Sequence, residues 1–169
     1  YTSPHLKEFT ERIRVDGQEV NRQFVTDFVN RMQSTIEEIK PSFFEVTVAM
    51  AFEYFAQQKV DVAVVEVGLG GRLDSTNVIT PLVSVITNIG WDHMDLLGDT
   101  LPQIAAEKAG IIKQRVPVVV SQRQEEVQHV FVGKAKQQSA ALFFASNKFE
   151  ATLQHDRLII QKDKSALLE

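Results

Sequence analysis

The sequence predicts an α/β fold: a mostly parallel sheet with helices on both faces, followed by an antiparallel hairpin near the C-terminus. Two observations predict this class. Short, nearly continuous apolar runs recur at 60–67, 82–87 and 116–120, and such runs are typical of strands buried on both faces of a parallel sheet. Segments with helical periodicity or helix-capping residues lie between these runs, and strands that alternate with helices favour the α/β class.

Two helices are expected before the first strand. Apolar residues recur every three or four positions between 20 and 39, which indicates one apolar face of a helix; these residues are Val20, Phe24, Phe28, Met32, Ile36 and Ile39. Ser42 and Glu45 have the capping-box spacing and predict a second helix that ends near Gln57. Upstream of both, Asp16 and Gly17 form a turn signal.

The glycines at 68, 70 and 71 end the first strand and predict a tight turn in which the backbone closely approaches another group. Thr100 and Gly110 are typical of the start and end of a short helix. The ranges 124–138, 142–144 and 149–161 are interpreted as a helix, a strand and a hairpin around His155 and Asp156. In this fold class, functional residues gather at the carboxyl ends of the strands.

Composition limits the functions that the chain can have. Its 169 residues predict one domain with a hydrophobic core. A net charge of −4, with both signs spread along the chain, favours neither a nucleic-acid nor an anionic-membrane partner. The absence of cysteine excludes disulfides, thiolate metal sites and a cysteine nucleophile. No apolar run approaches the roughly 20 residues of a membrane span, and no secretory signal is present, so we expect a cytoplasmic protein.

Glu66 and His93 are candidate ligands for Mg²⁺. Glu66 lies near the carboxyl end of a valine-rich run, where a carboxylate is costly unless a cation compensates it. His93 follows the next strand after a short loop, and the two side chains could reach one crevice. A carboxylate, an imidazole and a hydroxyl suit Mg²⁺ shared with phosphate oxygens. The alternative is that Glu66 pairs with an arginine and His93 is an ordinary loop residue. Asp92 and Asp95 are rival ligands.

Other polar residues have simple structural explanations on sequence grounds. Lys108 near a helix end complements the helix dipole. Ser3 is a loop hydroxyl before Pro4, and residues 74–77 read as a polar turn. The glycines at 68–71 match neither G-x-G-x-x-G nor the phosphate loop G-x-x-x-x-G-K-[ST], and the chain contains no phosphate loop.

Taken together, these stretches resemble the folylpolyglutamate synthase branch of the Mur ligase family. The long block Glu-Val-Gly-Leu-Gly-Gly-Arg-Leu-Asp-Ser-Thr-Asn-Val is the most specific part. All matching blocks run in order at 1–6, 11–13, 42–45, 66–78, 92–93, 96–98 and 107–113. The resemblance implies that residues 1–169 are part of a central ATP-binding domain of P-loop type. The family's phosphate loop would lie upstream of Tyr1, and its C-terminal domain downstream, so we expect a piece of a longer protein.

The resemblance also implies a function, that of an ATP-dependent ligase that adds L-glutamate to a folate through an acyl phosphate, with Mg²⁺ as cofactor. Ser3, Glu66 and His93 match its Mg²⁺ ligands, and Lys108 matches a lysine that the family carbamylates with CO₂. Two segments match the folate- or pteroate-binding regions, and they comprise Ser42, Phe43, Phe44, Glu45, Leu73, Asp74 and Ser75. Ser75 is a small departure, because some relatives have alanine there.

Alternatives stay open. The parent protein could act on folate alone or also on dihydropteroate. It could be another Mur-type amino-acid ligase, although the Ser-Phe-Phe-Glu and Gly-Gly-Arg-Leu-Asp segments argue against that. It could also be a non-catalytic binding module, against which Glu66, His93 and Lys108 argue. Without a phosphate loop, we expect the 169-residue chain to be inactive alone, and an unpaired sheet edge to promote its self-association.

Overall fold

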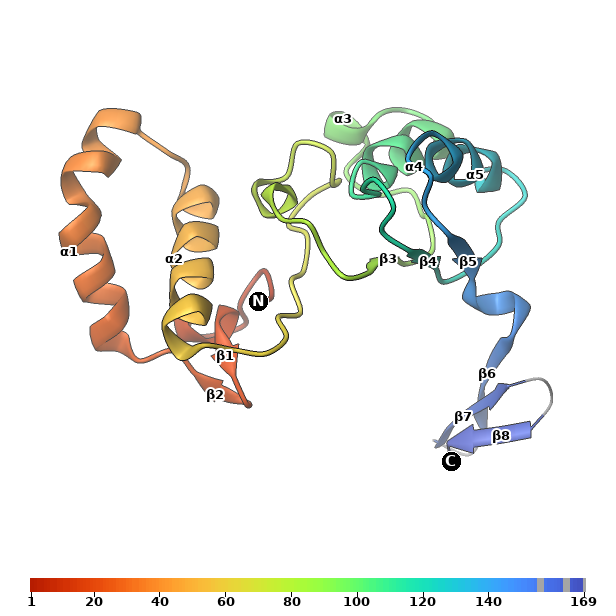
Figure 1. The fold of residues 1–169 in the computed structure, drawn as a ribbon, viewed down its shortest axis with the longest axis horizontal. Coiled ribbons are helices and arrows are strands. Elements are labelled where there is room, and N and C mark those ends of the chain that lie inside the picture. The colour runs from red at the N-terminus through yellow and green to blue at the C-terminus, as the bar shows by residue number, and fades with distance from the viewer. Residues whose placement is uncertain (155–156, 163–164, 169) are drawn as a thin grey trace. The chain divides into compact units, whose positions relative to one another are not determined.

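The computed structural model describes residues 1–154, 157–162 and 165–168. Chain length alone predicts one domain, whereas the chain divides into two compact units, residues 1–79 and residues 80–169 (Figure 1). Each unit has its own hydrophobic cluster. The candidate site residues are therefore distributed over two separately packed bodies.

Unit 1 is built around two long helices that lie side by side (Figure 1). Its elements are the 3-10 helix η1 (Phe9–Arg12), strands β1 (Arg14–Val15) and β2 (Gln18–Glu19), helices α1 (Arg22–Ile39) and α2 (Phe43–Gln58), and the 3-10 helix η2 (Ser75–Val78). Strands β1 and β2 pair antiparallel around Asp16 and Gly17, whose φ angles of 50° and 77° confirm the predicted turn.

Both helices of unit 1 begin as their sequences predict. The Asn21 side chain accepts a hydrogen bond from the Gln23 N–H at the start of α1. Ser42 and Glu45 form a reciprocal capping box at the start of α2, which confirms the predicted helix. The apolar faces of the two helices meet in one buried cluster, which contains Tyr1, Ile13, Val20, Phe28, Val48, Met50, Ala51 and Phe55.

The strand predicted over residues 60–67 is not formed. This segment forms no strand ladder, and Val62 and Val64 are 69% and 82% exposed. Its backbone pairs with Tyr1, which donates from its nitrogen to Val64 O (2.8 Å) and accepts at its carbonyl from the Glu66 N–H (3.0 Å). The prediction of a strand buried on both faces is wrong for unit 1, because a valine run is buried only where neighbouring strands and helices cover it.

Unit 2 contains the parallel sheet that the sequence predicts. Its elements are β3 (Ser84–Ile86), α3 (Met94–Leu97), α4 (Leu101–Ala109), β4 (Val118–Val120), α5 (Gln128–Gln137), β5 (Leu142–Phe144) and η3 (Ala145–Asn147). The strands run parallel in the order β3-β4-β5. Thr100 caps α4 and Gly110 ends it, as expected. The α/β class is therefore confirmed.

The two faces of this sheet differ. Ile86, Val118 and Val120 are buried in a cluster with residues of α4 and α5, which lie side by side against the strands (Figure 1). On the opposite face Val85 is 60% exposed and Phe143 is 49% exposed. Complete burial of residues 82–87 is therefore a wrong prediction, because strand burial alternates here with the two-residue period of a half-covered sheet. Within the described part of unit 2, α4 and α5 cover one face.

Residues after η3 form a small antiparallel sheet. Strand β6 (Phe149–Gln154) pairs with β7 (Arg157–Lys162), which confirms the predicted hairpin, and β8 (Ser165–Leu168) adds a third strand that the sequence did not predict. His155 and Asp156, around which the hairpin was predicted, lie outside the described residues. No described helix is both long and apolar enough to cross a membrane.

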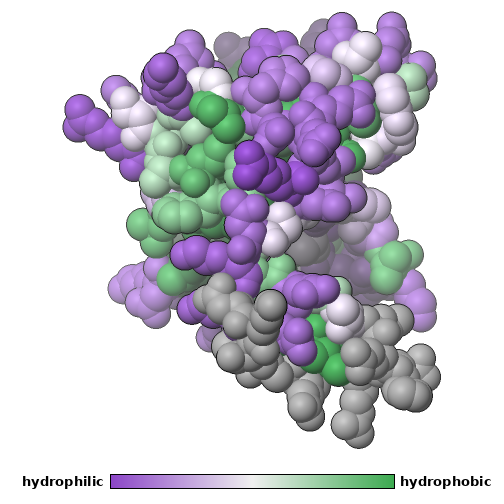
Figure 2. Space-filling model, turned by 90° about the vertical axis from the view of Figure 1, so that its right-hand side faces the viewer, coloured by the Kyte–Doolittle hydropathy of each residue, from purple (hydrophilic) through white to green (hydrophobic). Residues whose placement is uncertain are grey.

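Several large apolar side chains reach the surface. On the face drawn in Figure 2, apolar groups (green) gather between polar ones. In unit 2 the exposed apolar residues include Leu82, Val83, Val85, Val132 and Phe143. Strand β3 also has one edge without a strand partner among the described residues. These features support the expectation of self-association, which remains a prediction.

Candidate functional site

Two of the predicted Mg²⁺ ligands lie together in unit 1. The Ser3 N–H donates to Glu66 Oε2 at 2.9 Å, so the expected proximity of Ser3 and Glu66 is confirmed. The contact forms because residues 1–3 lie along residues 64–66 and share backbone hydrogen bonds with them. The serine hydroxyl and the glutamate carboxylate thus come from two segments that are far apart in sequence.

Glu66 differs from the prediction in its surroundings. The sequence places it in a buried strand, where its charge would need a cation, but the residue is exposed. Desolvation therefore gives no argument for a metal. The observation that matters is geometric: the Ser3 N–H occupies Oε2, and within the described ranges no protein group bonds to Oε1. One carboxylate oxygen remains available to a ligand.

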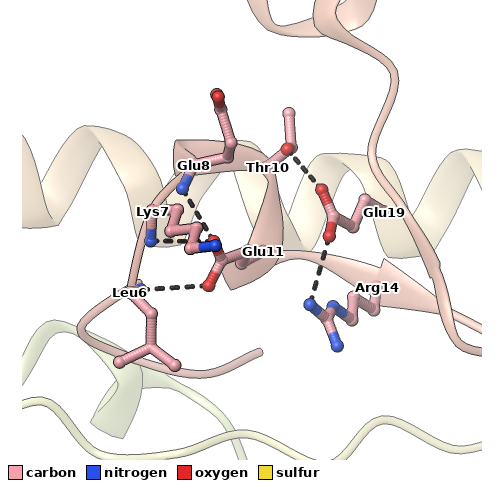
Figure 3. A network of polar contacts seen from close by, with 7 residues as sticks. All are labelled: Leu6, Lys7, Glu8, Thr10, Glu11, Arg14 and Glu19. Atoms are coloured by element: carbon pink, nitrogen blue, oxygen red, sulfur yellow. Dashed lines mark hydrogen bonds and ion pairs between the residues drawn. The ribbon is translucent and has the colours of Figure 1, made fainter.

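The loop that carries Ser3 is held at several points by residues 11 and 12. The Thr2 N–H donates to Arg12 O at 2.9 Å. The Arg12 Nε–H donates to His5 Nδ1 at 2.8 Å. Further along, the Leu6, Lys7 and Glu8 N–H groups all donate to the carboxylate of Glu11, at 3.0, 2.9 and 2.7 Å (Figure 3). These backbone hydrogen bonds lower the pKa of Glu11 from 4.5 to about 2, because they stabilise the charged carboxylate.

Arg12 is a largely buried cation beside the predicted folate-binding region. It is 8% exposed, and its guanidinium lies 5.4 Å from the centre of the Phe43 ring. Phe9 packs edge-on against the same ring. His5, Glu11 and Arg12 hold this loop, and the sequence analysis gave them no role. The available signal was the Glu-Arg-Ile block at 11–13, which belonged to the resemblance but had no role assigned.

The two predicted folate-binding segments meet within unit 1. A Cβ atom placed on Gly68 would lie 2.3 Å from Phe44 Cζ, so a larger residue at this position would require the ring to move. Asp74 binds the same turn, because its Oδ2 accepts from the N–H groups of Gly68 (3.0 Å) and Leu69 (2.9 Å). The predicted close approach of the glycine turn to another group is confirmed, and that group is Phe44.

The side chains of these segments divide into structural and available groups. Ser42 and Glu45 are engaged in the capping box, and the hydrogen bond from the Ser42 N–H lowers the pKa of Glu45. Asp74 accepts from the Gly68–Leu69 turn and from Thr76 at the start of η2, the element that Ser75 begins. Phe43 and Leu73 are 62% and 80% exposed. The apolar side chains can therefore contact a ligand, whereas the polar ones shape the loops.

His93 lies in unit 2, just before α3. Its backbone is left-handed (φ 49°), and its carbonyl accepts from the N–H groups of Leu96 and Leu97. The exposed ring has Nε2 3.6 Å from Asp92 Oδ1, which is too long for a hydrogen bond. Within the described residues no hydrogen bond holds the ring, and Asp92 lies at ion-pair distance from it. Asp92 and Asp95, the rival ligands, are exposed on the same segment.

Lys108 lies in the last turn of α4 and is partly buried. A lysine at this position complements the helix dipole, as the simple structural explanation requires. Along the described chain no carboxylate forms an ion pair with its ammonium group. Lys108 is therefore not committed to a structural salt bridge.

The donors suit Mg²⁺ in kind but are spread over both units. A hydroxyl and a carboxylate come from unit 1 and an imidazole from unit 2. Mg²⁺ accepts such a small protein set when water and phosphate oxygens complete its octahedron. No cluster of three or more His, Cys, Asp or Glu side chains suited to a metal occurs in the residues that the structure describes. Convergence of Glu66, His93 and Lys108 stays a prediction.

Comparisons with known proteins agree on one family. The Mur ligase middle domain matches residues 19–168. The chain is 45% identical over 147 residues to a dihydrofolate synthase/folylpolyglutamate synthase of Bacillus subtilis, covering 83% of this chain and 34% of that protein. It is 41% identical over 151 residues to the human mitochondrial folylpolyglutamate synthase, covering 85% of this chain and 26% of that protein.

Solved structures give the same result. A folylpolyglutamate synthase in complex with AMP-PCP matches with a TM-score of 0.88 and 35% identity, over 98% of this chain and 44% of that one. Escherichia coli FolC in complex with DHPP and ADP matches with a TM-score of 0.86 and 34% identity, over 99% of this chain and 40% of that one. The chain thus spans about a third of the Bacillus relative and less than half of these structures.

Proposed function

The chain belongs to the Mur ligase middle-domain family and is related to folylpolyglutamate synthases, and from this premise we propose that its full-length parent joins L-glutamate to a folate with the consumption of ATP. The observation that carries the proposal is the 45% identity to the Bacillus protein combined with the Ser3–Glu66 contact. The identity supports the activity, and the contact supports a metal-binding role for these two residues.

The proposed reaction has two steps. The terminal carboxylate of the folate attacks the γ-phosphorus of ATP, which gives an acyl phosphate and ADP. The amine of glutamate then attacks the acyl carbon, the amide bond forms, and phosphate leaves with the bonding electron pair. Bound at such a site, Mg²⁺ would offset charge on the phosphate oxygens. Ser3, Glu66 and His93 are the residues that would hold it.

Lys108 has a separate role in the proposal. Its neutral amine adds to CO₂ and loses a proton, which converts a cationic side chain into an anionic carbamate. An anion near the metal site would support the bound cation, whereas an ammonium group would repel it.

The acceptor would bind at the loops around α2. Phe43 offers an exposed ring flanked by Phe9 and Arg12, and Leu73 offers a second apolar contact. A flat pteridine can stack on such a ring. Dihydropteroate is a second candidate acceptor, because the Bacillus relative carries the names of both activities and the E. coli structure holds DHPP.

A mass-spectrometric assay of the full-length parent tests the proposed function. With Mg·ATP, L-glutamate and tetrahydrofolate, we expect a product heavier by one glutamyl residue and one ADP per amide bond. Dihydropteroate in place of the folate tests the second acceptor, and Glu66→Gln is the inactive control. Consumption of ATP without a glutamylated product from either acceptor would indicate another amino-acid ligase. No consumption of ATP under any condition would indicate a binding module.

A further inference from the structure

We propose that Glu11 is a positioning residue that holds the loop of residues 1–8 in the conformation in which Ser3 meets Glu66. The metal-binding part of this inference rests on the proposed function. Glu11 lies in η1, outside the predicted ligand set, and its carboxylate binds the loop through main-chain groups alone.

At Glu11 the backbone turns so that several N–H groups face one carboxylate. Oε1 accepts from the Lys7 and Glu8 N–H groups, and Oε2 accepts from the Leu6 N–H (Figure 3). Three consecutive amides pointing at one carboxylate define a single loop conformation. Hydrogen bonds to a charged acceptor are also stronger than neutral ones. Glutamine cannot replace the carboxylate here, because its NH₂ group would point a donor at a backbone donor.

The constraint reaches Ser3 through the loop itself. Glu11 fixes residues 6–8, Arg12 binds His5 and Thr2, and Glu66 Oε2 accepts from the Ser3 N–H. The loop is thus held by one carboxylate at each end and by Arg12 between them. Release of residues 6–8 removes one of these anchors, so the orientation of the Glu66 carboxylate becomes less well defined.

The role is separable from general stability. The Glu11 contacts are exposed hydrogen bonds, and Leu6, Lys7, Glu8 and Glu11 are not among the residues of the apolar cluster that holds the unit together. A matched control is Glu19, which also accepts hydrogen bonds in this region but only from the Thr10 and Arg14 side chains (Figure 3). Both residues lose one negative charge when replaced by glutamine.

The test compares the full-length parent with its Glu11→Gln and Glu19→Gln variants. Hydrogen exchange measured by mass spectrometry on a peptide covering residues 2–8 reports the loop without any need for ligase activity. Mn²⁺ titration followed by electron paramagnetic resonance, with AMP-PCP present, reports the metal site. For Glu11→Gln we expect loss of loop protection and a Mn²⁺ dissociation constant raised about tenfold, the lower end for groups that orient metal ligands.

Glu19→Gln should leave both readouts as in the unchanged protein. Unaltered protection of residues 2–8 in Glu11→Gln would overturn the proposal, and so would lost protection with unaltered Mn²⁺ affinity. Equal effects of the two substitutions would mean that Glu11 acts only as a general stabilising charge, and this result would also overturn the proposal. Failure of the proposed function would appear differently, as absence of glutamate ligation in the unchanged parent while loop protection still depended on Glu11.

Discussion

Replacement of Lys108 by alanine in the full-length parent is expected to lower kcat by on the order of 10²–10³-fold, the range for removal of one preorganised electrostatic group. The reason is the loss of the carbamate. Alanine has no amine that can add CO₂, so the metal site loses a supporting anion while α4 keeps its helix-forming character. The measurement is initial-rate kinetics of glutamate addition with and without added bicarbonate.

Varying the supply of bicarbonate separates the carbamate role of Lys108 from its role as a cation at the helix end. The unchanged parent should lose activity when CO₂ is removed and regain it with bicarbonate, whereas Lys108→Ala should respond to neither. Lys136→Ala, in the last turn of α5, removes an exposed cation from an equivalent helix position and should behave like the unchanged parent. Full activity of Lys108→Ala would remove Lys108 from the mechanism.

The isolated 169-residue chain is expected to show no measurable ligase activity and an affinity for Mg·ATP on the order of 1 mM or weaker. Its sequence contains no phosphate loop. Backbone N–H groups, a lysine and a hydroxyl of such a loop normally hold the β- and γ-phosphates. Since phosphoryl transfer depends mainly on positioning and charge stabilisation, metal ligands without this cradle have little on which to act.

Calorimetric titration of the chain with Mg·ATP measures this affinity, with the full-length parent as the positive control under the same buffer. Circular dichroism of the chain shows whether it is folded during the titration, so weak binding is not confused with unfolding. Micromolar affinity of the folded chain would mean that residues within 1–169 bind the nucleotide phosphates. This result would contradict the expectation that a phosphate loop outside these residues is needed.

Local signals in the sequence predicted the elements that depend on local chemistry. The Ser42–Glu45 capping box, the Asp16–Gly17 turn and the Thr100 cap each involve groups within a few residues of one another. The parallel strands β3 and β4 were also predictable, because short valine-containing apolar runs between helices have few other uses. The strand prediction for the valine run at 60–67 was wrong for a related reason. An apolar pattern indicates a preference for burial, but whether the segment is buried depends on strands and helices elsewhere in the fold.

The candidate site was predictable only in part. Ser3 and Glu66 meet as the family resemblance implied, although Glu66 is exposed and the burial argument made for it does not hold. Glu11 could not be found from spacing, because its partners are backbone N–H groups whose direction depends on the loop conformation. Arg12 had no role assigned from the sequence, and the fold buries it beside Phe43.

The proposed function requires that Ser3, Glu66 and His93 serve one metal ion in the full-length parent. Crystals of the full-length parent grown with Mn²⁺ and AMP-PCP test it directly through an anomalous difference map. We predict one anomalous peak in contact with a Glu66 carboxylate oxygen and a His93 ring nitrogen, with the Ser3 hydroxyl among its neighbours. A metal peak that contacts neither residue, or Glu66 and His93 held too far apart to share one ion, would contradict the account.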